Sequence, residues 1–251
     1  MPYGSYLSAS GAHVQNHRLE VLSNNLANIN TPGFKPSLAI VQARHSQSIE
    51  DGDISPGSGT LADIGGGAKI QPTQTMFDMG PIETTGNKTD FAITDDKSFF
   101  VVQRGEEQFL TRAGGFLFNA TGQLTNTNGD FVLGLDGNPI TIDPSARYDV
   151  NQNGTIQQNG ASLSLMLARP ESLGDLARAG DNLFKPLTPP QPVPLRERSI
   201  ASGQLEKSAV NPTSAMMELI EATRAYESNL RLIQHQDQAS GNLIGRMLRD
   251  S

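Results

Sequence analysis

The sequence predicts a mainly β central domain flanked by long N- and C-terminal α-helices that pair as a coiled-coil-like inner domain. Three observations lead to this fold class. Apolar residues recur with helical spacing at both ends of the 251-residue chain. Short apolar runs fill the middle, and pairs such as Asn-Gly and Asp-Gly separate them.

The first helix is expected within about residues 3–30. Its apolar seam is expected to contain Leu7, Val14 and Val21, and a second line that includes Leu26 widens the stripe. The helix should stop before Thr31-Pro32-Gly33, because a proline disfavours the helical conformation of the residue before it.

The central domain is expected to span residues 75–184. Its candidate strands are short and apolar: Phe91–Ile93, Phe99–Val102, Phe131–Leu133 and Ile140–Ile142. Turn sequences separate them, as at Asn128-Gly129-Asp130. Evenly spaced short strands with such turns are typical of an all-β domain.

The C-terminal helix is expected within residues 211–251. Asn211 supplies an N-cap and Pro212 occupies the first helical position. A heptad seam follows, and its apolar members are Met216, Leu219, Tyr226, Leu230, Ile233, Ile244 and Met247.

Two remaining stretches are expected as linkers. Residues 35–74 have little regular pattern and contain three consecutive glycines, and residues 185–210 are rich in proline. The N-terminal helical segment is accordingly placed at 1–34.

Each terminal helix has an apolar seam that nothing in its own region covers. Burial of one such side chain stabilises a fold by about 1.5–3 kcal/mol, whereas ordering the backbone costs roughly 1–2 kcal/mol per residue. The seams are therefore expected to meet each other or other copies of the chain.

Bulk composition excludes several classes of function. A net charge of −7 with scattered Lys and Arg argues against nucleic-acid binding, and the absence of cysteine excludes disulfide scaffolds and thiolate-metal sites. No stretch has the ~20 apolar residues that a membrane span needs. The first twenty residues lack the pattern of a cleaved secretion signal.

Four blocks of the sequence, in order, resemble the flagellar rod and hook protein family. The first is similar to the family signature SNNLANxNTPGFK, and the residues that carry it are Ser23, Asn24, Asn25, Leu26, Asn28, Pro32, Gly33, Phe34 and Lys35. The other blocks begin at Thr85-Gly86-Asn87, Leu110-Thr111-Arg112 and Leu205-Glu206-Lys207. Ala209 and Gly115 stand where the family often has Asn.

The resemblance implies a structural, non-enzymatic subunit of the basal-body rod that polymerises helically and transmits motor torque to the hook. The proximal rod type is favoured by the pattern Arg224, Glu227, Ile233 and Asp237, with a distal rod or hook-type subunit as the alternative. The implied partners are copies of the chain, other rod proteins and the flagellar type III export apparatus. The implied location is the periplasmic rod, reached without a cleaved signal, and no cofactor is implied.

Other readings rest on weaker patterns. His13 and His17 stand one helical turn apart but lack the HExxH pattern, and the calcium-loop-like stretch from Asp149 to Ile156 has Gly160 at its twelfth position, where a Glu is needed. A β-solenoid enzyme would need a regular repeat, which we do not find. An adhesin with the helices as an oligomerisation stalk remains an alternative of a different class.

Overall fold

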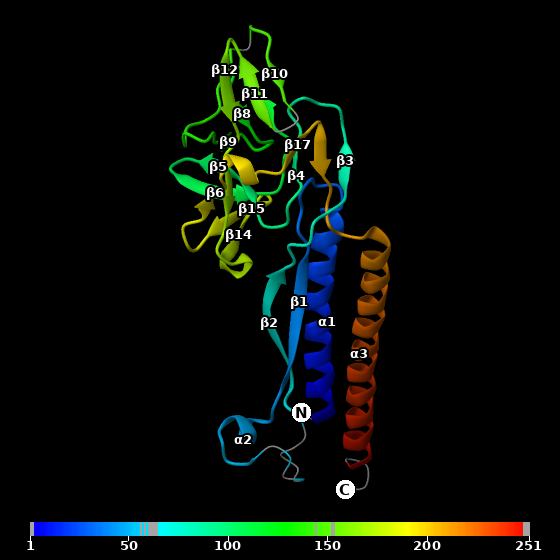
Figure 1. The fold of residues 1–251 in the computed structure, drawn as a ribbon. Helices are drawn as coiled ribbons and strands as arrows, with labels where there is room; N and C mark the ends of the chain where they lie inside the picture. Colours follow the sequence, from blue (N-terminus) through cyan, green and yellow to red (C-terminus); the bar gives the residue numbers. More distant parts are fainter. Residues whose placement is uncertain are drawn as a thin grey trace. The chain divides into compact units, whose positions relative to one another are not determined.

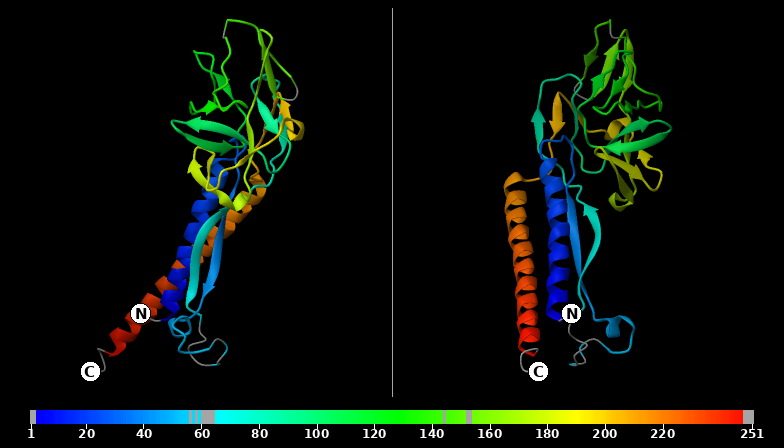
Figure 2. Two further views of the ribbon diagram at one scale, coloured as in Figure 1. Left: turned by 60° about the vertical axis from the view of Figure 1, so that its left-hand side comes forward. Right: turned by 180° about the vertical axis from the view of Figure 1, so that it is seen from behind.

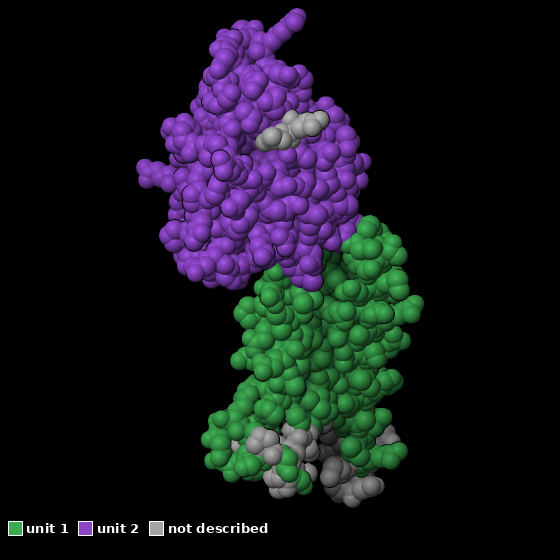
Figure 3. Space-filling view, in the orientation of Figure 1, with its two compact units in different colours: residues 1–27, 37–75, 211–251 green, residues 28–36, 76–210 purple. Residues whose placement is uncertain are grey.

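The computed structural model describes residues 3–55, 57, 59, 65–143, 145–151 and 154–247, without the side chains of residues 47, 48, 244 and 247. The chain divides into two compact units (Figure 3). Unit 1 contains residues 1–27, 37–75 and 211–251, and unit 2 contains residues 28–36 and 76–210. A mainly β chain with a long helix at each end confirms the broad fold class expected from the sequence.

Unit 1 consists of two long helices and a hairpin. Helix α1 (Tyr3–Ala27) and helix α3 (Pro212–Met247) lie side by side and run in opposite directions (Figure 1). Strands β1 (Ser37–Arg44) and β2 (Gly67–Thr75) form an antiparallel hairpin along α1 (Figure 2). A short helix, α2 (Gln47–Glu50), follows β1.

The ends of both long helices follow local sequence signals. Helix α1 ends four residues before Thr31 and five before Pro32, as the proline rule predicts. The Asn211 side chain accepts hydrogen bonds from the backbone N–H groups of Thr213 (3.0 Å) and Ser214 (3.2 Å), which confirms the predicted N-cap of α3.

The stretch 35–74, expected as a linker, differs from that expectation because it forms most of the β1–β2 hairpin. Its second strand, GAKIQPTQT, is largely polar and contains Pro72, so it has no alternating apolar signal. Pairing with β1, more than twenty residues earlier in the chain, makes it a strand. Sequence periodicity does not report such non-local pairing.

Unit 2 is built from short strands. Its first group comprises β3 (Ile82–Thr84), β4 (Phe91–Ile93), β5 (Phe99–Arg104), β6 (Glu107–Thr111), β7 (Leu117–Phe118), β8 (Leu124–Thr125), β9 (Phe131–Val132), β10 (Asp149–Val150), β11 (Thr155–Gln158) and β12 (Ala161–Ser164). Its second group comprises β13 (Leu167–Arg169), β14 (Leu176–Gly180), β15 (Leu183–Pro186), β16 (Gln191–Pro192), β17 (Ile200–Ser202) and β18 (Gln204–Glu206), with short 3-10 turns at Leu173–Asp175 and Leu195–Glu197.

The largest sheet among the described residues has the order β14-β15-β6-β5-β9-β8-β7, and β13 joins it beside β5. Strands β10, β11 and β12 form a separate sheet, while β17 pairs with β4 and β18 pairs with β3. The last two pairs join the end of unit 2 to its beginning, so the proline-rich stretch 185–210 is also more structured than the expected linker.

The core of unit 2 lies on both faces of β5. Phe100 and Val102 pack into one buried cluster, and Phe99 and Val101 pack into a second one. Alternate residues of a strand point to opposite faces, so a strand covered on both faces is apolar throughout. This explains the unbroken apolar run Phe99–Val102. The expected strand Ile140–Ile142, in contrast, makes one isolated bridge, between Thr141 and Gln123.

Candidate functional site

Small and polar residues form part of the contact between α1 and α3. Gly11 faces Asn229 closely enough that an added Cβ would lie 2.9 Å from the Asn229 Oδ1 atom, and Gly4 faces Gln236 in the same way. Arg18 and Glu218 form an ion pair at 3.6 Å. Since these pairs run in opposite senses along the two helices, they fix an antiparallel arrangement with close helix approach.

The predicted seam residues of α1 differ in their exposure. Val14 and Val21 are buried, Leu26 is half-buried, and Leu7 is 37% exposed. Leu22, which belongs to the same second apolar line as Leu26, is also buried. A helix that is covered by both α3 and the hairpin needs a wider buried surface than one heptad seam provides.

The inward face of α3 is shifted by one residue at alternate seam positions. Leu219, Tyr226 and Ile233 belong both to the predicted seam and to the observed inward face, and they are half-buried. Ala215 and Ala222 are buried, although the predicted seam contains the residues that follow them. The other predicted seam residues lie elsewhere: Met216 is 52% exposed and Leu230 is exposed, while the side chain of Ile244 lies outside the described part.

An exposed apolar patch therefore remains on the first turns of α3, formed by Met216, Met217 and Ile220. Each of the three side chains is more than half exposed. We call Met216, Met217 and Ile220 the outer stripe.

Polar side chains join α1 to the hairpin. Ser10 bonds both backbone groups of Ala68, donating to its carbonyl (3.3 Å) and accepting from its N–H (3.1 Å). Asn25 does the same with Ser37, donating to its carbonyl (2.8 Å) and accepting from its N–H (2.9 Å). Asn25 of the sequence motif thus hydrogen-bonds the backbone at the start of β1 within the same chain.

The rest of the motif shapes the turn that follows α1. Thr31 donates to the Asn28 side chain at 3.1 Å, and Asn182 donates to the Pro32 carbonyl at 2.8 Å. The Phe34 ring is buried under the Arg178 guanidinium, whose carbon lies 5.1 Å from the ring centroid. Ser23 and Asn24 are exposed.

Gly33 is required at its position for two reasons. Its φ angle is +66°, in the left-handed region that favours glycine. An added Cβ would also overlap the backbone of Arg112 and Ala113. The Gly33 N–H donates to the Glu206 carbonyl at 2.7 Å, so the turn is fixed against two distant segments.

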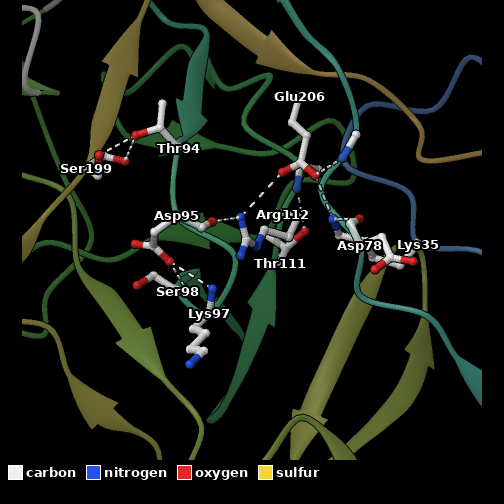
Figure 4. A network of polar contacts seen from close by, with 12 residues as sticks. Lys35, Asp78, Thr94, Asp95, Lys97, Ser98, Thr111, Arg112, Ser199 and Glu206 are labelled. Carbon is white, nitrogen blue, oxygen red and sulfur yellow. Dashed lines mark hydrogen bonds and ion pairs between the residues drawn. The ribbon is translucent and has the colours of Figure 1, made fainter.

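Three charged side chains from different motif blocks meet in the interior of unit 2 (Figure 4). The Lys35 ammonium lies 2.6 Å from Glu206 Oε1, and Arg112 Nη1 lies 3.5 Å from Glu206 Oε2. All three residues are at most 1% exposed. We call Lys35, Arg112 and Glu206 the ionic cluster.

Hydrogen bonds to the backbone add to the ionic cluster. Lys35 also donates to the Asp78 carbonyl (2.6 Å), Glu206 Oε1 accepts from the Gly80 N–H (2.9 Å), and Arg112 donates to the Asp95 carbonyl (2.6 Å). Burial lowers the pKa of Lys35, and the adjacent Glu206 carboxylate opposes this effect. The sequence placed these residues in family motifs but gave no signal that they meet.

The patterns considered for metal binding do not converge on a site. Among the described residues, no group of three His, Asp or Glu side chains is placed to hold a metal ion. His17 lies 3.7 Å from Glu20, and the stretch after Asp149 lies in a hairpin between β10 and β11, although two residues of its turn lie outside the described part. No described helix is long and apolar enough to cross a bilayer.

The paired terminal helices leave an exposed apolar stripe, and such a patch marks a surface that contacts other protein chains. Three family descriptions match the chain. Residues 6–35 match the flagella basal body rod protein, residues 92–160 the flagellar hook protein FlgE/F/G D1 domain, and residues 201–246 the flagellar basal body rod FlgEFG protein C-terminal region.

Similar proteins cover nearly the whole chain. The flagellar basal-body rod protein FlgF of Caulobacter vibrioides is 32% identical over 244 residues, which are 96% of each chain. FlgF of Rhizobium meliloti is 31% identical over 91% of this chain and 90% of its own length. The rod protein FlgG of Bacillus subtilis is 28% identical over 95% of this chain and 97% of its own length.

The chain belongs to the flagellar basal-body rod protein family. It is a structural subunit of the basal-body rod and not an enzyme.

Proposed function

We propose that this chain is a rod subunit of the proximal type, which polymerises helically and transmits motor torque to the hook. Relatives named FlgF support this assignment. A distal rod or hook-type subunit is the alternative. In the proposed assembly, α1 and α3 form a coiled-coil-like inner domain.

One observation carries the proposal of self-assembly. The outer stripe leaves Met216, Met217 and Ile220 more than half exposed on a helix whose other face already contacts α1. Burial of such side chains stabilises a contact by about 1.5–3 kcal/mol each. A contact between copies that uses different surfaces on each copy repeats without closing and gives an open filament.

We also propose the route by which the subunit reaches the rod. It leaves the cell through the flagellar type III export apparatus without a cleaved signal and assembles in the periplasm with copies of itself and other rod proteins. The similarity to flagellar basal-body rod proteins over nearly the whole chain supports this route.

Substitution in the outer stripe tests the assembly. We expect Ile220→Glu to abolish swimming and to remove the subunit from isolated basal bodies, while the purified monomer keeps its thermal stability because Ile220 is already 51% exposed. Ser228→Glu, at an exposed position elsewhere on α3, is the matched control and should swim normally. Normal swimming of Ile220→Glu would refute the role of the stripe.

A further inference from the structure

The chain passes between the two units four times, at residues 27/28, 36/37, 75/76 and 210/211. Any force that travels along the chain from one unit to the other passes through these crossings. On the side of unit 2 they belong to three segments: residues 28–36, the stretch that starts at Met76, and the stretch that ends at Val210.

Each of these three segments is hydrogen-bonded to the other two through the backbone. Met76 donates to the Pro36 carbonyl at 2.9 Å, Ala209 donates to the Phe34 carbonyl at 3.1 Å, and Lys207 donates to the Pro81 carbonyl at 2.8 Å. The three segments therefore form a closed set of contacts within unit 2.

The ionic cluster lies at the centre of this set. Lys35 comes from the first segment, Glu206 from the third, and the second contributes the Asp78 carbonyl and the Gly80 N–H. The Glu206 carboxylate therefore holds all three segments, since Oε1 accepts from both Lys35 and Gly80. Arg112 ties the same carboxylate to the central sheet, because it directly follows β6.

The backbone at Gly80 is closely packed beside the ionic cluster. A Cβ on Gly80 would overlap the Lys207 carbonyl, so the second and third segments are in direct backbone contact. Buried ionic hydrogen bonds break less readily than solvated ones because neither partner can exchange to water in place. Hydrogen bonds of this kind resist the sliding of one segment past another.

We propose that the ionic cluster locks the four chain crossings into one mechanical element, so that twisting force enters or leaves the β unit through cross-linked segments instead of through separate strands. Its role in force transmission rests on the proposed function as a torque-bearing rod subunit. Glu206 is the positioning residue of this device, and Lys35 and Arg112 act through it.

The first test measures amide hydrogen exchange of the full-length chain by mass spectrometry. For Glu206→Gln we expect exchange in peptides covering 28–36, 76–83 and 203–210 to rise together, by about tenfold or more, because all three lose a shared charged partner. For Lys35→Met, which leaves Glu206 paired with Arg112, we expect a smaller rise in the same three peptides.

Lys207→Met is the matched control. Lys207 forms an ion pair of the same length, 2.6 Å, with Glu83, but both side chains are more than half exposed. Exposed pairs contribute little to stability, so we expect a change of less than about twofold. If the rise in Glu206→Gln or Lys35→Met is confined to the peptide that carries the substitution, the cluster does not couple the segments. If Glu206→Gln does not fold, Lys35→Met decides.

The second test measures swimming of strains that carry Lys35→Met or Lys207→Met. We expect both to yield basal bodies in normal amounts, and Lys35→Met to swim more slowly than Lys207→Met in viscous medium, where the motor works against the larger load. Equal speeds at every viscosity would overturn the force-transmitting role. If a strain lacking the chain still swims, the proposed function fails, whereas the exchange result for the cluster stands.

Discussion

Gly33→Ala is expected to destabilise the protein far more than an alanine at another glycine with the same backbone angle. Gly33 has φ +66° and Gly105 has φ +64°, but a Cβ on Gly105 would meet no atom within 4 Å. A left-handed alanine costs roughly 1–2 kcal/mol at either position. Gly33→Ala must also displace the Arg112 backbone, which is in direct contact with Gly33.

That displacement breaks the hydrogen bond from Gly33 to the Glu206 carbonyl, which is 2.7 Å long. A buried donor left without a partner costs about 1–3 kcal/mol. The sum is about 2–5 kcal/mol for Gly33→Ala, compared with about 1–2 kcal/mol for Gly105→Ala.

Urea denaturation of both purified variants measures the difference in their free energies of unfolding. It is followed by circular dichroism and by tyrosine fluorescence, since the chain has no tryptophan. Unchanged m-values would show that the change lies in stability and not in the extent of unfolding. Equal losses in the two variants would refute the reasoning, because the backbone angle alone would then account for Gly33.

Three further predictions follow from other parts of the chain. Burial raises the pKa of Asp130, but hydrogen bonds led by Arg104 outweigh it and lower the pKa, so Asp130→Asn should destabilise the protein at pH 7. Urea titrations measure the free energy of unfolding of both proteins. The difference between them should shrink as the pH falls below about 4, the usual pKa of Asp, and should disappear below the lowered pKa of Asp130 in the folded state. A difference that persists at low pH would contradict this. Asn211→Ala should cost about 1 kcal/mol and increase exchange in the first turn of α3, with Ser228→Ala as a control that leaves that turn unchanged. Ala222→Leu, at a position that is 1% exposed, should cost about 1–3 kcal/mol in thermal unfolding by overfilling the contact with α1, and a neutral result would mean that α3 does not pack there.

The sequence by itself determined the features that depend on neighbouring residues. The helix N-cap at Asn211, the end of α1 before Pro32 and the strands at Phe91 and Phe99 all follow from local signals, and each occurs where it was expected. Capping, proline geometry and runs of β-forming residues act within a few residues, so a sequence window contains their cause.

Only the tertiary structure decided which side of each helix is covered and which distant residues meet. Ala222 is buried and Met216 is exposed, although each belongs to a series of residues with heptad spacing on α3. The position of α1 decides which of the two series faces inward. Lys35 and Glu206 are 171 positions apart, and their pairing depends on three segments folding together. Burial and charge pairing are properties of the folded surroundings of a side chain, so no local pattern in the sequence reports them.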